Sequence, residues 1–196
     1  MRFIRKFTLA AASVAMMAVQ ASSAQAAGLS PFSPADEVVG YAVEQACFTW
    51  LRHGGALKDY VHRSSRTVRQ PSPKTGDNPG SDKAEKLYGG GHVTVQEAFN
   101  GSCYIRGARG NGAAMRDKVL SSLRDMGFAP EAFADYSLAA RNRDWSFLQE
   151  SYCVRDADTV RIVLISSSAS GARTPLQVSI MNDREGLAAK KGLCLG

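Results

Sequence analysis

The sequence predicts an α+β fold: two main helices packed on one face of a mostly antiparallel sheet of about five strands, with two disulfides. Two segments carry apolar residues at helical spacing, and a hairpin pattern lies between them. Three strand-like stretches follow in the last third of the chain. This order of helix, hairpin, helix and meander favours two helices that cover one antiparallel sheet.

The first helix is expected over 33–55. Ser33 is a good N-cap residue, Pro34 suits the first helical position, and two glycines supply the C-terminal stop. At about 100° per residue, one broad face collects Val39, Gly40, Val43, Ala46, Cys47, Trp50 and Leu51. A face this wide must be buried, so we expect it to lie on the sheet.

The other side of this helix is less polar than a solvent-facing side usually is. Tyr41 and Phe48 lie there, seven residues apart, with charged residues around them. This aromatic pair is a candidate contact surface for a partner. The alternative is that the long loop or the C-terminal tail covers both rings.

Residues 56–69 have some helical spacing and are compatible with a second short helix. Arg63, Arg66 and Arg69 recur every third residue, so a helix would place them along one side. Such a strip is a candidate binding site for the phosphate or carboxylate groups of a partner. The alternative is a solvated basic edge with no ligand.

A long loop is expected over 70–91. This stretch contains three prolines, five glycines and no sustained apolar period. Loops of this length are uncommon in compact domains, and they are usually functional or disordered.

A β-hairpin is expected over 92–107, around an Asn-Gly pair. A two-residue turn would set Val95 opposite Arg106. A three-residue loop, with glycine in the left-handed position, pairs Val95 with Ile105 and puts Cys103 on their face. We prefer the second register because burial favours a face on which the apolar residues gather.

The glycine-rich segment 107–112 leads into a second helix over 113–126. Its apolar stripe consists of Met115, Val119, Leu120 and Leu123. Asn111 can cap this helix and Gly127 can end it. The free backbone N–H groups before the helix, together with Arg109, are a candidate anion site. The alternative is a plain connection that needs positive φ at glycine.

Three strands are expected over 147–155, 159–168 and 176–181. If the polar residues between the first two strands form a three-residue loop, Tyr152 faces Ile162. The third strand alternates, with Leu176, Val178 and Ile180 pointing inward.

The four cysteines, Cys47, Cys103, Cys153 and Cys194, are spaced by dozens of residues, and no CxxC motif occurs. In an oxidising compartment, an even number predicts two disulfides, and the sequence alone allows three pairings. The expected packing puts Cys47 and Cys103 between helix and hairpin. We therefore favour Cys47–Cys103, which leaves Cys153–Cys194 to tie the tail across the other face of the sheet.

Residues 1–26 are interpreted as a cleaved signal peptide. Three basic residues precede an apolar run over 7–19, and a small-x-small cleavage site ends at Ala26. The apolar run is too short for a good membrane span, and no cysteine near this site would carry a lipid. We therefore expect one domain over 27–196, periplasmic or secreted, with no membrane span after cleavage.

The charge of the chain argues against a nucleic-acid partner. The sequence has 24 Lys+Arg and 18 Asp+Glu, a net charge of +6. Without the three basic residues of the signal peptide, 21 remain against 18, a net charge of +3. A nucleic-acid binder usually shows a stronger basic stripe with aromatic residues in it.

No common catalytic or nucleotide-binding motif occurs in the sequence. His53, His62 and His92 lack the spacing of a zinc site, so we expect no metal and no cofactor. A hydrolytic site would need a histidine, a carboxylate such as Asp156 and a serine of the 166–170 stretch to meet in space. An ordinary Ser/Gly loop between strands is the alternative for that stretch.

We therefore predict a noncatalytic binding or interaction module of the cell envelope, stabilised by two disulfides. The expected partner is an envelope protein or an anionic envelope polymer, and the oligomeric state stays open. The alternative is an envelope hydrolase whose catalytic site is assembled from separated residues.

Overall fold

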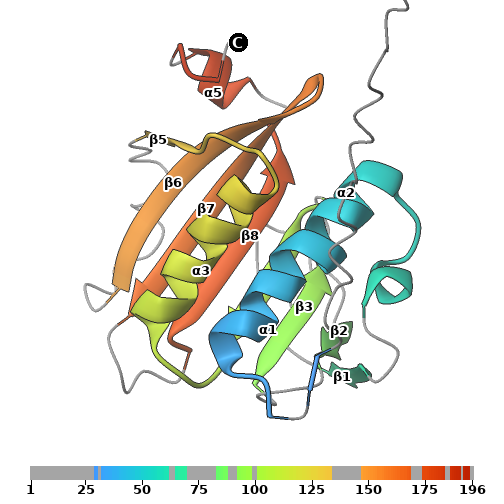
Figure 1. The fold of residues 1–196 in the computed structure, drawn as a ribbon. Helices are drawn as coiled ribbons and strands as arrows, with labels where there is room; N and C mark the ends of the chain where they lie inside the picture. Colours follow the sequence, from blue (N-terminus) through green and yellow to red (C-terminus); the bar gives the residue numbers. More distant parts are fainter. Residues whose placement is uncertain are drawn as a thin grey trace, which may run out of the picture.

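The computed structural model describes residues 29–30, 32–61, 65–69, 83–87, 92–98, 101–133, 147–168, 174–183, 186–190 and 192–194. They form one antiparallel sheet of eight strands, and two long helices lie side by side across one of its faces (Figure 1). The strands are β1 (Arg66–Arg69), β2 (Lys83–Lys86), β3 (Val93–Glu97), β4 (Cys103–Gly107), β5 (Glu131–Phe133), β6 (Phe147–Asp156), β7 (Thr159–Ser168) and β8 (Leu176–Asn182). Their order in the sheet is β1-β2-β3-β4-β8-β7-β6-β5. No described helix is long and apolar enough to cross a membrane.

The predicted fold class is wrong, because eight strands replace the expected five and the fold is mostly sheet with about two real helices. The sequence predicts none of β1, β2 and β5, whose residues are RTVR, KAEK and EAF. Segments this short and polar lack the alternation by which a strand is recognised. β2 lies inside the stretch expected to be a loop. β1 lies in the stretch compatible with a short helix, and among the described residues of that stretch the 3-10 turn η2, Leu57–Tyr60, is the helical part.

The first helix runs without interruption from Ala35 to His53, and its middle is π-helical. It consists of α1 (Ala35–Tyr41), the π segment η1 (Ala42–Phe48) and α2 (Thr49–His53). A π-helix has i→i+5 hydrogen bonds, so it takes more residues per turn than an α-helix. A helical wheel drawn at a constant 100° therefore misplaces the later residues. This explains why Phe48 is fully buried.

The second helix, α3, spans Gly112–Asp125 and has the predicted cap and the predicted buried stripe. Asn111 Oδ1 accepts hydrogen bonds of 2.9 and 3.2 Å from two backbone N–H groups of the first turn. A Cβ atom added at Gly112 would lie 2.2 Å from the carbonyl oxygen of Ser168 and 2.4 Å from that of Pro175. Only glycine fits there, which explains the glycine-rich approach to α3 in structural terms.

The preferred register of the β3–β4 hairpin is confirmed, since Val95 pairs with Ile105. The β6–β7 hairpin differs from the prediction by one position. Its turn has two residues instead of three, and Ala157 adopts a φ of +52° in it. Tyr152 consequently lies opposite Val163 rather than Ile162. A slip of one residue exchanges the two faces of a strand, so Ile162 lies on the opposite face of the sheet from Tyr152.

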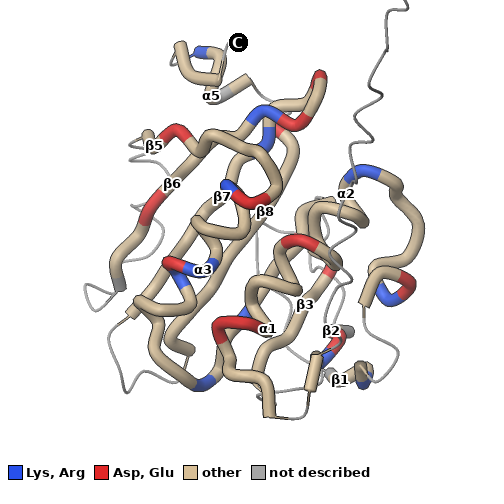
Figure 2. The backbone as a smooth tube through the Cα atoms, in the orientation of Figure 1, with Lys and Arg blue, Asp and Glu red and all other residues tan. Residues whose placement is uncertain are grey.

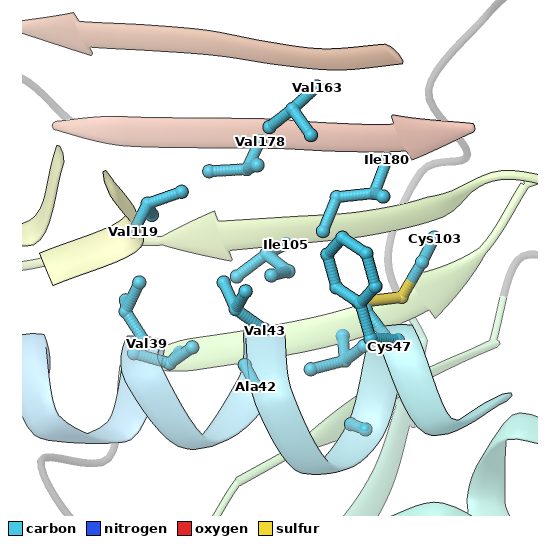
Figure 3. Packing of buried hydrophobic residues seen from close by; sticks show 14 of the residues in the cluster. Val39, Ala42, Val43, Cys47, Cys103, Ile105, Val119, Val163, Val178 and Ile180 are labelled. Atoms are coloured by element: carbon cyan, nitrogen blue, oxygen red, sulfur yellow. A yellow bond between two sulfur atoms is a disulfide. The ribbon is translucent and has the colours of Figure 1, made fainter. Parts of the chain in front are cut away.

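The main hydrophobic core lies between the two helices and the sheet (Figure 3). The fully buried residues Val39, Val43, Ile105, Val163, Val178 and Ile180 meet there. The disulfide Cys47–Cys103 joins η1 to β4 inside this core. Both predicted disulfides are present, with the pairing that the expected packing favours.

A second, smaller cluster lies on the opposite face of the sheet, which we call the far face. The C-terminal segment, including the short helix α5 (Leu187–Lys190), packs there against β6 and β7. The disulfide Cys153–Cys194 holds it, and Ile162 and Ala188 are buried beside the bond. The tail therefore covers one end of the far face.

Candidate anion-binding site

A row of polar residues crosses seven strands on the far face. Its members are direct neighbours in the strand register, and we call them the polar row: Arg66, Lys86, Thr94, Arg106, Gln177, Ser166 and Gln149. The residues that alternate with them, such as Val95, Ile105 and Val178, belong to the core beneath the helices. Because successive residues of a strand point to opposite faces, the polar row lies on the side away from the helices.

Three members of the polar row are cations and none is an acid. Arg66 and Lys86 are exposed on β1 and β2, at one edge of the sheet (Figure 2), and Arg106 is half-buried on β4. Neighbouring strands lie about 4.8 Å apart, so the three cations span roughly 14 Å. Glu85, next to Lys86, faces the other way and accepts a hydrogen bond of 2.8 Å from the Thr67 hydroxyl.

One further basic group, His92, flanks the row. His92 lies two residues before Thr94, which gives it the same side of β3. Its pKa is lowered by burial and by the positive charges of Arg109 and Lys86. Burial is the largest of these causes, and the two cations add to it by disfavouring a further proton on His92.

Tyr104 links the residues of the inner part of the row. Its hydroxyl donates a hydrogen bond of 2.7 Å to Oε1 of Gln177. The guanidinium of Arg106 also lies over the Tyr104 ring, 5.9 Å from its centroid. Burial raises the pKa of Tyr104, so its hydroxyl stays protonated and can donate. Arg106 Nε and Ser166 Oγ are buried and have no hydrogen-bond partner.

The predicted arginine strip does not exist in the form expected. Arg66 and Arg69 belong to a strand, not a helix, and Arg63 lies outside the described residues. Positions three apart in a strand fall on opposite faces, whereas on a helix they share a side. Of the two arginines that the structure describes, Arg66 takes a position in the polar row and Arg69 does not.

The predicted contact pair of Tyr41 and Phe48 is also not present as a pair. Tyr41 is half-buried and packs against the core, and burial raises its pKa. Phe48 is fully buried, with its ring centroid 5.0 Å from that of Phe128. Arg52 and Arg161 place their guanidinium groups 5.9 and 5.8 Å from the Phe48 ring. Phe48 therefore offers no surface to a partner.

A buried ion-pair network lies next to Phe48, at the end of α2. Asp156 accepts hydrogen bonds from Arg52 at 2.7 Å and from Arg161 at 2.7 Å. The side chains of Asp156 and Arg161 are 7% and 4% exposed. Burial tends to raise the pKa of Asp156, but the two arginines outweigh it and hold this pKa below its usual value. Asp156 is therefore a structural anion, fully engaged by two arginines.

The hydrolytic alternative gains no support from the described residues. His53 is exposed at the end of α2, and His62 lies outside the described residues. The charges that act on His92 are cations. Glu150 forms an ion pair with Arg116, and the hydrogen bonds that Arg116 donates lower the pKa of Glu150. Asp156 lies on the helix-covered side and Ser166 on the far face, so these two cannot share a site.

Three possible metal-ligand atoms lie within 4.8 Å of one another, on Glu131, Cys153 and Cys194. Both sulfur atoms belong to a disulfide, and Glu131 accepts a hydrogen bond from the Cys194 backbone N–H. In this oxidised form the group offers a single carboxylate, which is too few ligands for a metal site.

Sequence reasoning missed Lys86, Arg106, Gln177 and Ser166 as members of one site. Arg106 and Gln177 alternate with buried residues in strands that were predicted, so the pattern places both on the outer face. Lys86 gave no such signal because β2 is not recognisable as a strand from the sequence. The pairing of β4 with β8, which brings Arg106 next to Gln177, joins segments about seventy residues apart and leaves no local trace in the sequence.

No protein-family model matches this chain, and no curated protein or solved structure matches it, so the functional argument rests on its own residues.

Proposed function

We propose that this protein is a noncatalytic binding module of the cell envelope, which binds an anionic polymer along the polar row. The observation that carries the proposal is the register of Arg66, Lys86 and Arg106. Cations from three strands line up on one face, and the row contains no carboxylate to neutralise them.

The arrangement suits a chain of anionic groups better than one isolated charge. Exposed charges attract each other weakly in water, and a single surface ion pair is worth about 0.2–1 kcal/mol. Affinity must therefore come from several contacts made together. Cations spaced over roughly 14 Å match a polymer that carries an anionic group on each repeating unit.

The two disulfides support a location outside the cytoplasm. Disulfides persist in oxidising compartments and are rare in reducing ones. Together with the signal peptide proposed over 1–26, they favour the periplasm or the cell exterior as the place where the polar row meets its ligand. Anionic polymers are common components of bacterial envelopes, which makes them suitable partners by charge.

The test is retention of the protein on immobilised polyphosphate over a salt gradient. We expect Arg66→Gln together with Lys86→Gln to weaken binding about tenfold, because two ion pairs are lost. The matched control is Arg124→Gln together with Lys190→Gln, which removes the same charge from exposed positions away from the row. The control should elute at nearly the salt concentration of the unmodified protein.

If both double variants lose retention equally, net charge alone explains binding and the polar row has no special role. If neither double variant loses retention, the ligand is not a polyanion and the proposal is wrong.

A further inference from the structure

The inner part of the polar row contains buried polar atoms without a hydrogen-bond partner, a property that the exposed cations lack. Arg106, Gln177 and Ser166 are consecutive neighbours on β4, β8 and β7. Arg106 Nε and Ser166 Oγ are buried without a hydrogen-bond partner. The only other such side-chain atom among the described residues is Ser122 Oγ, on α3. Two of the three atoms thus flank one residue, Gln177.

Unpartnered buried donors are costly, and a charged one costs most. Leaving a buried polar group without a partner costs about 1–3 kcal/mol, and more for a charged group. Nearly all buried polar groups in native proteins are satisfied, by protein atoms or by water or ions. The guanidinium of Arg106 therefore gains most from a negatively charged partner.

The hydrogen bond of Tyr104 decides which atoms of Gln177 remain for a ligand. The Tyr104 hydroxyl donates its proton to Oε1 of Gln177 at 2.7 Å, so this oxygen is occupied. The remaining polar atom of Gln177 is the amide nitrogen, which only donates. Arg106, Gln177 and the Ser166 hydroxyl then present three donors, and an anion can accept from all of them.

The distance between Arg106 and Ser166 favours a small anionic group as the ligand. Paired residues on adjacent antiparallel strands have Cα atoms about 4.5–5.5 Å apart, so Arg106 and Ser166 are separated by roughly 10 Å at the backbone. An arginine side chain is several ångströms long, so one compact anionic group can bridge the side chains of Arg106 and Ser166. Charge-assisted hydrogen bonds to such a group are about 2.8 Å long.

We infer that Arg106, Gln177 and Ser166 form a site for one compact oxyanion, a carboxylate or a phosphate group. The inference rests on the proposed function: Arg66 and Lys86 attract the polymer, and the inner site holds one of its anionic groups. Tyr104 positions Arg106 and Gln177 and does not itself contact the anion.

Titration with inorganic phosphate and, separately, with acetate tests the inference, with NMR shifts of side-chain and backbone N–H groups as the readout. We expect the Arg106 Nε–H signal and the neighbouring amides of β7 and β8 to shift. Arg106→Lys keeps the charge but removes the Nε–H, and it should weaken binding at least fivefold. The anion that binds more tightly, phosphate or acetate, identifies the chemical source of the oxyanion.

Serine variants supply a matched pair that leaves the charge unchanged. Ser166→Ala should weaken anion binding about threefold or more, because it removes one donor. Ser122→Ala removes the other unpartnered buried hydroxyl, which lies between the helices beside Gly40, and should leave binding unchanged. A thermal melt gives a second readout: phosphate should raise the Tm of the unmodified protein and of Ser122→Ala, and raise it less in Ser166→Ala.

Two outcomes separate this inference from the proposed function. If neither phosphate nor acetate shifts the signals of the inner site, while polyphosphate retention still depends on Arg66 and Lys86, the inner site is wrong and the polymer-binding row stands. If the small anions bind as expected but retention ignores Arg66 and Lys86, the inner site stands and the polymer proposal fails. Equal effects of Ser166→Ala and Ser122→Ala would overturn the inner site as well.

Discussion

The two faces of the sheet are built for different tasks. The helix-covered face is a continuous apolar core, in which Val43, Ile105 and Ile180 are fully buried. The far face has a small apolar cluster at one end and the polar row at the other. The difference indicates that the helix-covered face supplies most of the stability. The far face is therefore free to carry residues that a core would exclude.

Each face has one disulfide, so the stabilisation that each bond contributes can be compared between the two faces. Cys47 and Cys103 are 56 residues apart, and Cys153 and Cys194 are 41 apart. On the chain-entropy account, loops of these lengths are worth nearly the same, about 4 kcal/mol each. Any large difference between the two bonds must therefore come from what surrounds them.

Replacement of Cys47 and Cys103 by alanine has the largest expected effect. The bond lies in the main core and its loss is felt by the whole fold, so the free energy of unfolding should fall by about 4 kcal/mol. Denaturant unfolding monitored by tryptophan fluorescence measures it. A loss no larger than that caused by removing the Cys153–Cys194 bond would contradict the division between the two faces.

Asp156→Asn comes next, because it leaves Arg161 buried without its anion. Removing one partner of a buried pair costs about 3–5 kcal/mol, and we expect about 3 kcal/mol since Arg52 is 41% exposed. Asp117→Asn is the control, because its side chain is 68% exposed and pairs with Arg116 at the surface. The control should change the unfolding free energy by less than about 0.5 kcal/mol.

Replacement of Cys153 and Cys194 by alanine should have a smaller effect, about 1–2 kcal/mol, at the low end for disulfides. The tail can leave the far face while the helix-covered core stays folded, so the unfolded state is not the only alternative. Limited trypsin digestion should cleave after Lys190 faster than in the unmodified protein. Global unfolding of this variant at ordinary temperature would show that the tail is part of the main core.

The smallest expected effect is a pH dependence from Asp156. Its pKa is lowered in the folded state, so its contribution to stability is complete above the ordinary pKa of about 4. The contribution decreases as the pH falls through the lower pKa of the folded state. Thermal melts between pH 7 and pH 2 should show less acid destabilisation in Asp156→Asn than in the unmodified protein. An equal decrease of Tm with falling pH in both proteins would exclude Asp156 as the source of the acid destabilisation.

The elements with clear local signals could be predicted from the sequence. The stripe of α3, its Asn111 cap and the register of β3 and β4 all depend on residues close together in the chain. The disulfide pairing followed from the same register, because it put Cys103 on the helix side. Local patterns are sufficient where a single periodicity holds.

The predictions that were wrong fail for identifiable physical reasons. Phe48 was misplaced because η1 does not turn by the angle of an α-helix. Arg66 and Arg69 were assigned to one side because a short polar strand resembles an irregular helix in sequence. The polar row as a whole could not be predicted, since the pairing of β4 with β8 depends on the complete sheet.

The strand order also bears on how the chain reaches this fold. A helix followed by four strands occurs twice among the described elements, and the halves meet where β4 pairs with β8. Each disulfide lies within one half, so the first cysteine pairs with the second and the third with the fourth. A chain that emerges from its N-terminus can thus oxidise the first pair before the third cysteine appears. Correct pairing then needs no reshuffling, and we expect the long-range joining of β4 and β8 to be the slow, late step of folding.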